Sequence, residues 1–444
     1  MSICKLNKSM KRFAIVLASL LAAGLPSAAW AEKARFTFLK TISVAELNVI
    51  LDAEREEFIN NEVPGAGPGY QKPAAPKATN AVDIYTVVYE TRIPERNNEP
   101  ASVSGMLALP RLADRSKIPL MSYQRGTVYN KYSVPSYAFQ AKSPWPYDHR
   151  PEAYETRYMA ALFAGNGYAL VAADYVGFGV DAKSDEAYLI KGVTAQASVD
   201  LVGDATRYLF TRKITPSNLF LSGWSQGGHN TGAVLQMLES QGVQVRAAFT
   251  AANPNDPYAA VSGVFFHPQD TDSPWFSLMI GQTAFSCEMF GGPDGLARNA
   301  LHPKFYEDFK SIYKRTYGNP AGDPEVLKQM LVNWSKQPLI SFLRPELRDP
   351  AAFAASDFGR CLARNEAFRQ DIKADVRIHY GTNDQIIRQR LGRLGADYQL
   401  VLEGAPLTTQ ASTNLVPIPV QGGTHRLTFL SGSVDAKAWL DPLR

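Results

Sequence analysis

The sequence predicts an α/β protein, in which a mostly parallel sheet is flanked by helices and carries a helical cap or lid insertion. Three observations predict this class. Short apolar runs alternate with segments of helical periodicity, which is the pattern of a parallel sheet with crossover helices. A serine flanked by glycines stands where one such strand meets one such helix. A long stretch of proline, glycine and aromatic residues then interrupts the alternation from residue 253 to about residue 373.

The first part of the chain is expected to supply one helix and two strands. Apolar residues recur at helical spacing over residues 43–59, which predicts a helix packed on the core. A Pro/Gly-rich connection follows at residues 64–76. Residues 81–91 and 101–109 alternate or run apolar as strands do, with a polar turn at residues 95–100 between them.

The rest of the predicted core consists of further strands and one long helix. The helix covers residues 194–213, where Leu201, Ala205 and Leu209 share one face, and Pro216 is expected to end that region. Within the insertion, residues 303–317 and 324–334 have short helical patterns. The strands are expected at residues 118–123, 168–174, 219–223, 245–251 and 376–381.

These patterns divide the chain into five parts. The insertion at residues 256–369 lies between the first part of the core (81–255) and the second part (370–444), where a cap can cover the carboxyl ends of the strands. A helix and linker precede the core at residues 32–80, and a targeting segment occupies residues 1–31.

The first 31 residues have the three parts of a secretory signal peptide. The basic residues that come first are Lys5, Lys8, Lys11 and Arg12. An uncharged apolar run follows at residues 13–25, and Ala29-Trp30-Ala31 is a small-x-small cleavage site. Because the apolar run is shorter than the roughly 20 residues that a spanning helix needs, we expect cleavage after Ala31. The mature protein is then secreted or periplasmic and carries no transmembrane anchor.

Composition argues against several kinds of partner. The 444-residue chain has a formal net charge of +4, and losing four basic and no acidic residues with the signal peptide brings the mature chain to 4 − 4 = 0. A net charge of zero gives no indication of nucleic-acid binding. The sequence has no histidine pair at helical spacing with a nearby acid, no Cys-x-x-Cys and no phosphate loop, so neither a metal nor a cofactor is expected. Nothing indicates the oligomeric state.

The mature chain retains two of the three cysteines. Cys4 leaves with the signal peptide, and Cys287 and Cys361 remain. An even pair in an oxidising compartment favours a disulfide. Two buried free thiols are the alternative, because a sequence does not show whether the Cβ atoms come within about 4 Å of each other.

The most informative segment is Gly223-Trp224-Ser225-Gln226-Gly227, which directly follows the apolar run at residues 219–221. It has the pattern of a nucleophile elbow, in which a serine sits on a sharp turn between a strand and a helix. Such a strained turn packs only if the residues two before and two after the serine have almost no side chain, and here both are glycine. Apolar residues at helical spacing follow over residues 233–238.

Together with three further segments, the elbow resembles the α/β-hydrolase superfamily, and within it the bacterial and fungal secretory lipases and carboxylesterases. The further segments are Tyr123-Gln124-Arg125-Gly126-Thr127 after an apolar strand, Asp174-Tyr175-Val176-Gly177-Phe178-Gly179, and a late aspartate and histidine. The resemblance covers roughly residues 81–260 and 370–430. The first 80 residues and the insertion match nothing specific.

A serine nucleophile needs a base within hydrogen-bond reach and a third group that orients the base. Asp384 is the only carboxylate at the C-terminal exit of the predicted strand 376–381, with Glu403 in reserve, and His425 lies near the end of the chain. The order Ser225, Asp384, His425 is the one expected for this fold.

His425 is also selected as the base by elimination among the six histidines. His149, His267 and His302 fall in Pro-rich or inserted segments. His379 lies inside a predicted strand, and His229 is expected in the first turns of the elbow helix, pointing away from the serine hydroxyl.

Acyl transfer also needs hydrogen-bond donors aimed at the oxyanion. The backbone N–H of Gln226 is expected to be one. The resemblance places the second donor at Thr127, in a segment where Gln124-Arg125-Gly126-Thr127 replaces the histidine-glycine pair common in the superfamily. Because Arg125 departs from that pattern, Gly126 is the alternative donor.

For two further segments the sequence allows either a structural role or a substrate-binding role. The segment Asp174–Gly179 is either a structural turn with two glycines or a loop that contacts substrate. The aromatic residues of the insertion either line an acyl pocket or form a small core of their own, and Trp275 and Phe276 are our candidates for substrate contact. These aromatic residues are Phe265, Phe266, Trp275, Phe276, Phe285 and Phe290.

The sequence therefore predicts a serine esterase or lipase that cleaves small-molecule or lipid carboxylic esters through an acyl-enzyme. Ser225 attacks, His425 carries the proton and Asp384 orients His425. A serine peptidase that removes short N-terminal peptides uses the same triad on the same fold and is the first alternative. A non-catalytic binding protein on a degenerate core is the second, although it predicts loss of a triad residue and none is missing. Acyl transfer to an alcohol or sugar also remains open.

Overall fold

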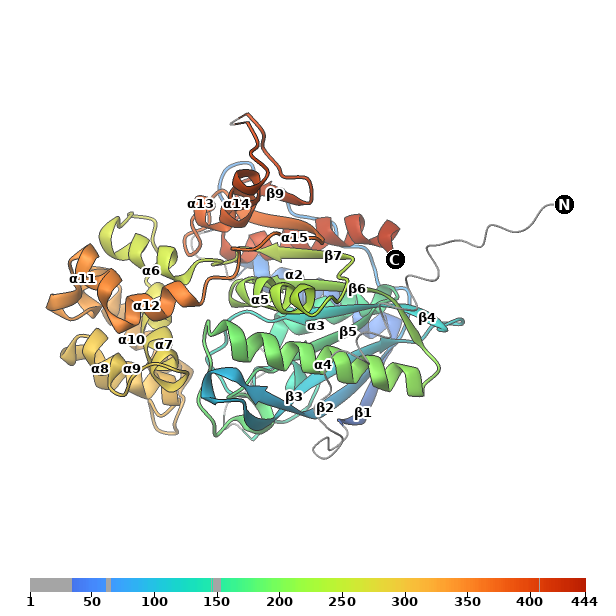
Figure 1. Ribbon diagram of the computed structural model, residues 1–444. Coiled ribbons are helices and arrows are strands. Elements are labelled where there is room, and N and C mark those ends of the chain that lie inside the picture. Colours follow the sequence, from blue (N-terminus) through green and yellow to red (C-terminus); the bar gives the residue numbers. More distant parts are fainter. Residues whose placement is uncertain (1–33, 61–64, 145, 147–152, 407) are drawn as a thin grey trace.

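The computed structural model describes residues 34–60, 65–144, 146, 153–406 and 408–444. The predicted signal peptide, its cleavage site and His149 lie outside the described residues. A nine-stranded sheet forms the centre of the described chain, in the order β1-β2-β3-β5-β4-β6-β7-β8-β9 (Figure 1). The strands β5, β4, β6, β7, β8 and β9 run parallel to one another, whereas β1, β2 and β3 pair antiparallel. The predicted class, a mostly parallel sheet flanked by helices, is confirmed.

Each of the seven predicted strands is present, as β2 to β8 of the nine strands in the described chain. The nine strands are β1 (Arg35–Ile42), β2 (Val82–Ile93), β3 (Glu99–Pro110), β4 (Lys117–Gln124), β5 (Ala169–Ala173), β6 (Thr215–Trp224), β7 (Ala247–Ala251), β8 (Asp375–Gly381) and β9 (Leu415–Val420).

Two strands, β1 and β9, were not predicted, and both lie at an edge of the sheet. β1 is largely exposed, with Phe38 at 52% exposure, so its sequence lacks the alternation of a half-buried strand. β9 contains Pro417 and Pro419, which argue against a central strand but are tolerated at an edge, where one side of the strand needs no partner. Pro216 was expected to end a helix, but it lies inside β6.

Helices cover both faces of the sheet. On one face, α2 (Val44–Asn60), α3 (Tyr154–Leu162) and α15 (His425–Leu440) share a core with side chains such as Ile84. On the other face lie α4 (Lys191–Thr211) and α5 (Gln226–Ser240). Tyr85 points to the opposite face from Ile84, as alternation along a strand requires. The helices α13 (Gln389–Gly392) and α14 (Leu394–Leu402) connect β8 to β9.

The segment between β7 and β8 forms a group of helices on one side of the sheet, which we call the cap (Figure 1). Its helices are α6 (Pro257–Phe266), α7 (Phe276–Met289), α8 (Leu296–Ala300), α9 (Pro303–Lys314), α10 (Pro324–Trp334), α11 (Pro350–Ala355) and α12 (Asp357–Arg364). Short 3₁₀ helices complete the described structure: Pro94–Arg96, Pro135–Tyr137, Ala164–Asn166, Gly179–Asp181, Leu339–Phe342, Pro345–Leu347 and Asp441–Leu443.

Aromatic rings and a disulfide hold the cap together. Phe305, Phe309 and Phe342 pack around the ring of Trp334. The predicted disulfide joins Cys287 on α7 to Cys361 on α12, with Cα atoms 6.0 Å apart. These aromatic residues pack against one another, and they belong to the same hydrophobic cluster as side chains on one face of the sheet, so they do not form a separate core. Separately, none of the helices among the described residues is both long and apolar enough to cross a bilayer.

Candidate active site

Ser225 occupies the turn between β6 and α5. Its backbone has φ 55° and ψ −123°, a strained conformation for a residue with a side chain, and its N–H donates to the carbonyl of Ala251 at 3.0 Å. A Cβ on Gly223 would lie 2.1 Å from the Gly227 oxygen, and one on Gly227 would lie 1.9 Å from the Gln124 oxygen. The turn that exposes the serine hydroxyl therefore requires both glycines.

His425 is the first residue of α15 and reaches the serine directly. Its Nε2 lies 2.8 Å from the Ser225 Oγ. The indole N–H of Trp224 donates to the His425 carbonyl at 3.1 Å, and the two rings pack with centroids 5.3 Å apart. The neighbour of the serine thus fixes the backbone of the histidine, which leaves Nε2 within reach of the hydroxyl proton.

Asp384 follows β8 and faces the other ring nitrogen of His425. Its Oδ2 lies 3.1 Å from Nδ1, and its side chain is fully buried. The Asp384 Oδ1 accepts hydrogen bonds from the backbone N–H groups of Ile386 at 2.9 Å and Ile387 at 2.8 Å. These two donors hold the carboxyl group in place beside the imidazole. With Nδ1 directed at Asp384, Nε2 faces the Ser225 hydroxyl and is positioned to accept its proton.

The remaining described histidines face other partners. His379 lies between the Asp435 carboxylate and the carbonyl of Thr250. His229 is buried against the carbonyl of Asn365 at 2.6 Å, and burial lowers its pKa. His302 caps α9 through Nδ1. In the described part of the chain, His425 is the only histidine within hydrogen-bond distance of Ser225.

The alternative acid has a different position. Glu403 follows α14 and accepts a hydrogen bond from the backbone N–H of Thr413 at 2.8 Å. No hydrogen bond joins Glu403 to His425 among the described residues. The structure therefore brings together Ser225, His425 and Asp384, the three residues of the predicted triad.

The two predicted oxyanion donors lie at the ends of neighbouring strands. Gln226 begins α5, and Thr127 lies in the loop after β4, the strand beside β6. Within the described chain, neither backbone N–H donates to another residue. The N–H of Gly126, the alternative donor, already donates to the Glu155 Oε1 at 2.8 Å. Of Thr127 and Gly126, therefore, Thr127 is the residue whose backbone N–H is left for a ligand.

Arg125, which departs from the superfamily pattern, is buried and serves the loop itself. Its guanidinium donates to the carbonyls of Gly126 at 2.8 Å and Asp174 at 2.9 Å. It also stacks over the rings of Phe178 and Tyr175, at 4.2 and 4.6 Å. These contacts join the loop after β4 to the loop after β5.

The segment Asp174–Gly179 is held by buried contacts with other parts of the core. Burial raises the pKa of Asp174, although the Ser104 and Ser136 hydroxyls donate to it at 2.6 and 2.5 Å. Gly177 and Gly179 have φ values of 87° and 60°. These contacts agree with the structural alternative for this segment.

Sequence reasoning missed Glu155, which lies in the first turn of α3. Burial raises the pKa of this carboxyl to about 7. An acidic residue in a first helical turn is usually a favourable partner of the helix dipole, so its sequence position gave no signal that it holds Gly126 beside the serine.

The two candidate substrate residues lie in different surroundings. Trp275 is 44% exposed, and its ring packs 5.7 Å from the ring of Tyr129, two residues after Thr127. Phe276 is buried in the main hydrophobic core. Ser225 itself is only 6% exposed, so the candidate site is largely covered.

No protein-family model matches the chain, and no curated protein matches it by sequence. Solved structures do match. A presumed hydrolase from Legionella pneumophila has a TM-score of 0.69 at 16% identity, with 92% of this chain and 97% of that chain covered. The rice cell wall degrading esterase LipA from Xanthomonas oryzae, in a ligand-bound form, has a TM-score of 0.68 at 16% identity, with 94% and 98% covered.

Candida antarctica lipase A is a more distant match, with a TM-score of 0.56 at 16% identity and coverage of 78% of this chain and 73% of that chain. At these identities the likeness shows the fold and leaves the chemistry to be argued from the site. The sheet order, the elbow at the end of β6 and these three neighbours together identify the protein as one with the α/β-hydrolase fold.

Proposed function

We propose that the protein is a serine hydrolase that cleaves carboxylic esters through an acyl-enzyme. The observation that carries the proposal is the hydrogen-bonded series Ser225, His425, Asp384, with 2.8 Å between Ser225 Oγ and His425 Nε2 and 3.1 Å between His425 Nδ1 and Asp384 Oδ2. This is the arrangement that activates a serine hydroxyl, whatever fold carries it.

In the proposed reaction, His425 takes the Ser225 hydroxyl proton as Oγ attacks the ester carbonyl. The tetrahedral oxyanion is held by the backbone N–H groups of Gln226 and Thr127. His425 then gives its proton to the departing alcohol, which leaves an acyl group on Ser225. A water molecule, activated by the same histidine, repeats the sequence and releases the acid. Asp384 stabilises the imidazolium that forms in each half.

We further propose that the cap selects the acyl group. Tyr129 and Trp275 pack together beside the loop that carries Thr127, and Trp275 is partly open to solvent. Apolar surface at that point favours acyl chains over charged substrates, at about 0.8 kcal/mol for each CH₂ that becomes buried. Small-molecule or lipid esters are therefore the proposed substrates.

The proposed location is outside the cytoplasm. The disulfide between Cys287 and Cys361 fits an oxidising compartment, and the N-terminal sequence has the pattern of a cleaved export signal. Intact-mass analysis of exported protein is expected to give Glu32 as the first residue. Retention of Met1 in that protein would contradict the processing.

The function is tested by comparing p-nitrophenyl acyl esters with aminoacyl p-nitroanilides for the wild type and for Ser225→Ala. We expect the wild type to hydrolyse the esters, and the variant to lose that activity while remaining folded. An organophosphate is expected to label Ser225 alone. Preferential cleavage of the anilides would support the peptidase alternative, and equal rates in the two proteins would overturn the serine mechanism.

A further inference from the structure

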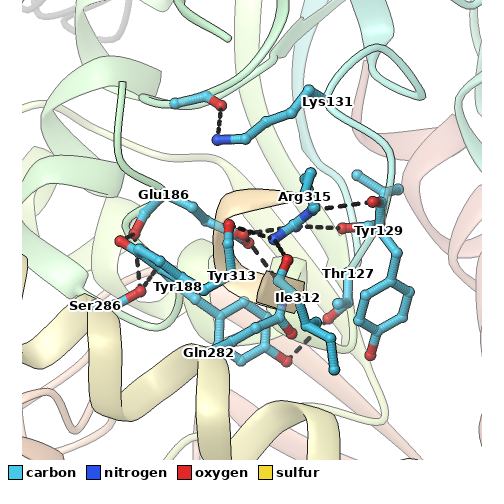
Figure 2. Close-up of polar contacts among 12 residues, drawn as sticks. Thr127, Tyr129, Lys131, Glu186, Tyr188, Gln282, Ser286, Ile312, Tyr313 and Arg315 are labelled. Atoms are coloured by element: carbon cyan, nitrogen blue, oxygen red, sulfur yellow. Dashed lines mark hydrogen bonds and ion pairs between the residues drawn. The ribbon is translucent and has the colours of Figure 1, made fainter. Parts of the chain in front are cut away.

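Arg315, the C-cap residue directly after α9, extends from the cap toward Tyr129 and Glu186 (Figure 2). It has a left-handed backbone, with φ 57°, and its side chain is only 1% exposed. Two of its donors satisfy carbonyls at the end of its own helix, those of Ile312 and Tyr313, each at 3.0 Å.

The other donors of Arg315 bind the loop that carries Thr127. Its Nε donates to the Tyr129 carbonyl at 2.9 Å, and its Nη2 donates to the Val128 carbonyl at 3.2 Å. These are the two residues that directly follow Thr127. A residue of the cap thus holds the backbone of the candidate oxyanion loop (Figure 2).

The loop is held on the other side of Thr127 as well, by residues of the core. Arg125 binds the Gly126 carbonyl, which belongs to the same peptide unit as the Thr127 N–H. Because a trans peptide points its C=O and N–H in opposite directions, this bond turns the Thr127 N–H away from Arg125. Arg315 holds the Val128 and Tyr129 carbonyls, which begin one peptide unit beyond Thr127. Thr127 therefore lies between a segment held by Arg125 and a segment held by Arg315, and the direction of its N–H depends on both arginines.

Glu186 is the ionic partner of Arg315. The Glu186 Oε2 accepts from the Arg315 Nη2 at 2.7 Å, and both side chains are 1% exposed. Burial is the largest single influence on the pKa of Arg315 and lowers it, but Glu186 together with Tyr317 and Tyr129 raises the pKa overall. The Glu186 carbonyl accepts from the hydroxyls of Tyr313 and Ser286, at 2.7 and 2.8 Å, and both donors belong to the cap.

A second contact reaches Thr127 through its side chain. The Tyr188 hydroxyl lies 3.0 Å from the Thr127 Oγ1, and the Tyr188 N–H donates to the Ser286 Oγ at 2.9 Å (Figure 2). The cap therefore contacts both the backbone after Thr127 and the residue that binds its hydroxyl.

Stability alone does not account for this arrangement. A buried ion pair contributes little more to folding than well-packed apolar side chains of the same volume, because both charges lose their hydration. An arginine in this position does provide several donors in a fixed fork, which lets it hold consecutive carbonyls at defined angles. These fixed donors define the geometry of the loop after β4 more than they stabilise the fold.

We propose that Arg315 is a positioning residue of the hydrolase, which, paired with Glu186, fixes the oxyanion loop from the cap and makes the cap a permanent part of the active site. The inference rests on the proposed function. The oxyanion exists only in the tetrahedral state, so a misplaced Thr127 N–H lowers kcat and leaves KM almost unchanged.

The test compares Arg315→Met and Arg315→Lys with the wild type, using a p-nitrophenyl ester. Loss of one oxyanion donor lowers kcat by about 10²- to 10³-fold in serine hydrolases, and we expect a fall of about 100-fold for Arg315→Met with KM within about threefold. An alkylboronic acid, which forms a tetrahedral adduct on the serine, is expected to bind more weakly by a similar factor. Arg315→Lys keeps the charge beside Glu186 but lacks the fork, so it too is expected to lose kcat.

Arg348→Met is the matched control. Arg348 also lies in the cap and donates to backbone carbonyls, but only to those of Leu343 and Ser341 within the cap itself. We expect its kcat, KM and boronic acid affinity to match the wild type. Arg315→Met leaves Glu186 without its ionic partner. If it fails to fold for that reason alone, the double variant Glu186→Gln/Arg315→Met removes both charges. Arg315→Lys tests whether the guanidinium positions the loop while the charge pair stays intact.

Two outcomes overturn the inference alone, and in both the wild type is active. In the first, Arg315→Lys or the double variant folds and has an unchanged kcat. In the second, the loss of activity in the variants comes entirely from a higher KM. A wild type no more active than Ser225→Ala overturns the proposed function instead, and the inference with it. The two failures are therefore distinguishable in one set of assays.

Discussion

The two sides of the candidate site are constructed in different ways. On the triad side, Ser225, Asp384 and His425 each follow the end of a strand, and short backbone contacts orient them. On the proposed oxyanion side, the loop after β4 is held by buried ionisable side chains from distant segments, namely Glu155 on α3 and Arg315 in the cap. Strand order positions the proposed nucleophile and base, whereas long-range polar contacts position the loop of the proposed oxyanion donor Thr127.

The largest expected effect is on the triad side. Ser225→Ala and His425→Ala are expected to lower kcat by about four to six orders of magnitude, and Asp384→Ala by less, because a triad acts as a unit. Melting temperatures and steady-state ester hydrolysis are the measurements. His379→Asn is the control, since His379 contacts Asp435 and not the serine. Full loss of turnover in the control together with an active His425→Ala would show that the base is misassigned.

The second prediction concerns the cap. The disulfide closes a segment whose ends are 74 residues apart, and a bond across a loop of this length stabilises by about 4 kcal/mol in the chain-entropy model. We expect Cys287→Ser/Cys361→Ser to lose up to this amount in the free energy of unfolding, measured by urea denaturation.

If the cap holds the oxyanion loop, this double variant also loses esterase activity on heating before the sheet unfolds. Activity and circular dichroism, followed on one temperature scale, separate the two events. Coincident transitions would show that the cap and the core form a single cooperative unit.

The third prediction uses the pH dependence of Glu155. Burial raises the pKa of this carboxyl to about 7, from an ordinary value of 4.5. The folded state therefore favours the protonated form, so the stability that Glu155 contributes is fully present below the unfolded pKa and is lost as pH rises through the folded pKa. A shift of this size is worth up to about 3 kcal/mol.

Glu155→Gln keeps an acceptor for the Gly126 N–H but does not ionise, so it isolates this contribution. Relative to the variant, we expect the wild type to lose stability between pH 5 and pH 7.5 in urea unfolding. Parallel stabilities over that range would show that Glu155 ionises in the folded protein as easily as in the unfolded chain.

The same contrast explains what the sequence could predict. The residues of the proposed triad could be selected from the sequence because an elbow needs glycines at fixed offsets, and because the acid and base of this fold follow strands in a known order. Glu155 and Arg315 could not be selected from the sequence, because each makes its contact with a residue far away in the chain. The separation is 29 residues between Glu155 and Gly126 and 187 residues between Arg315 and Val128. Neither distance leaves a local pattern. The edge strand β9 was missed for a different reason, because its prolines argue against a strand except at an edge.

The smallest expected effect lies where the cap meets the oxyanion loop. Trp275 packs against Tyr129 and remains 44% exposed, so it has free surface that an acyl chain can cover. In the wild type, kcat/KM is expected to rise along a short series of p-nitrophenyl esters, because each added CH₂ buries apolar surface worth about 0.8 kcal/mol at most.

Trp275→Ala is expected to flatten that series by roughly 1 kcal/mol, about fivefold for the longest ester, while acetate-ester cleavage changes little. Val332→Ala is the control, since Val332 is also an exposed apolar residue of the cap, at 49% exposure, but lies on α10. Phe276→Ala is a weaker probe, because Phe276 is buried and its loss creates a cavity in the core. A chain-length series that is the same in the wild type and Trp275→Ala would place acyl selection in the loops of the sheet. The cap would then act on the reaction only through Arg315, by holding the oxyanion loop.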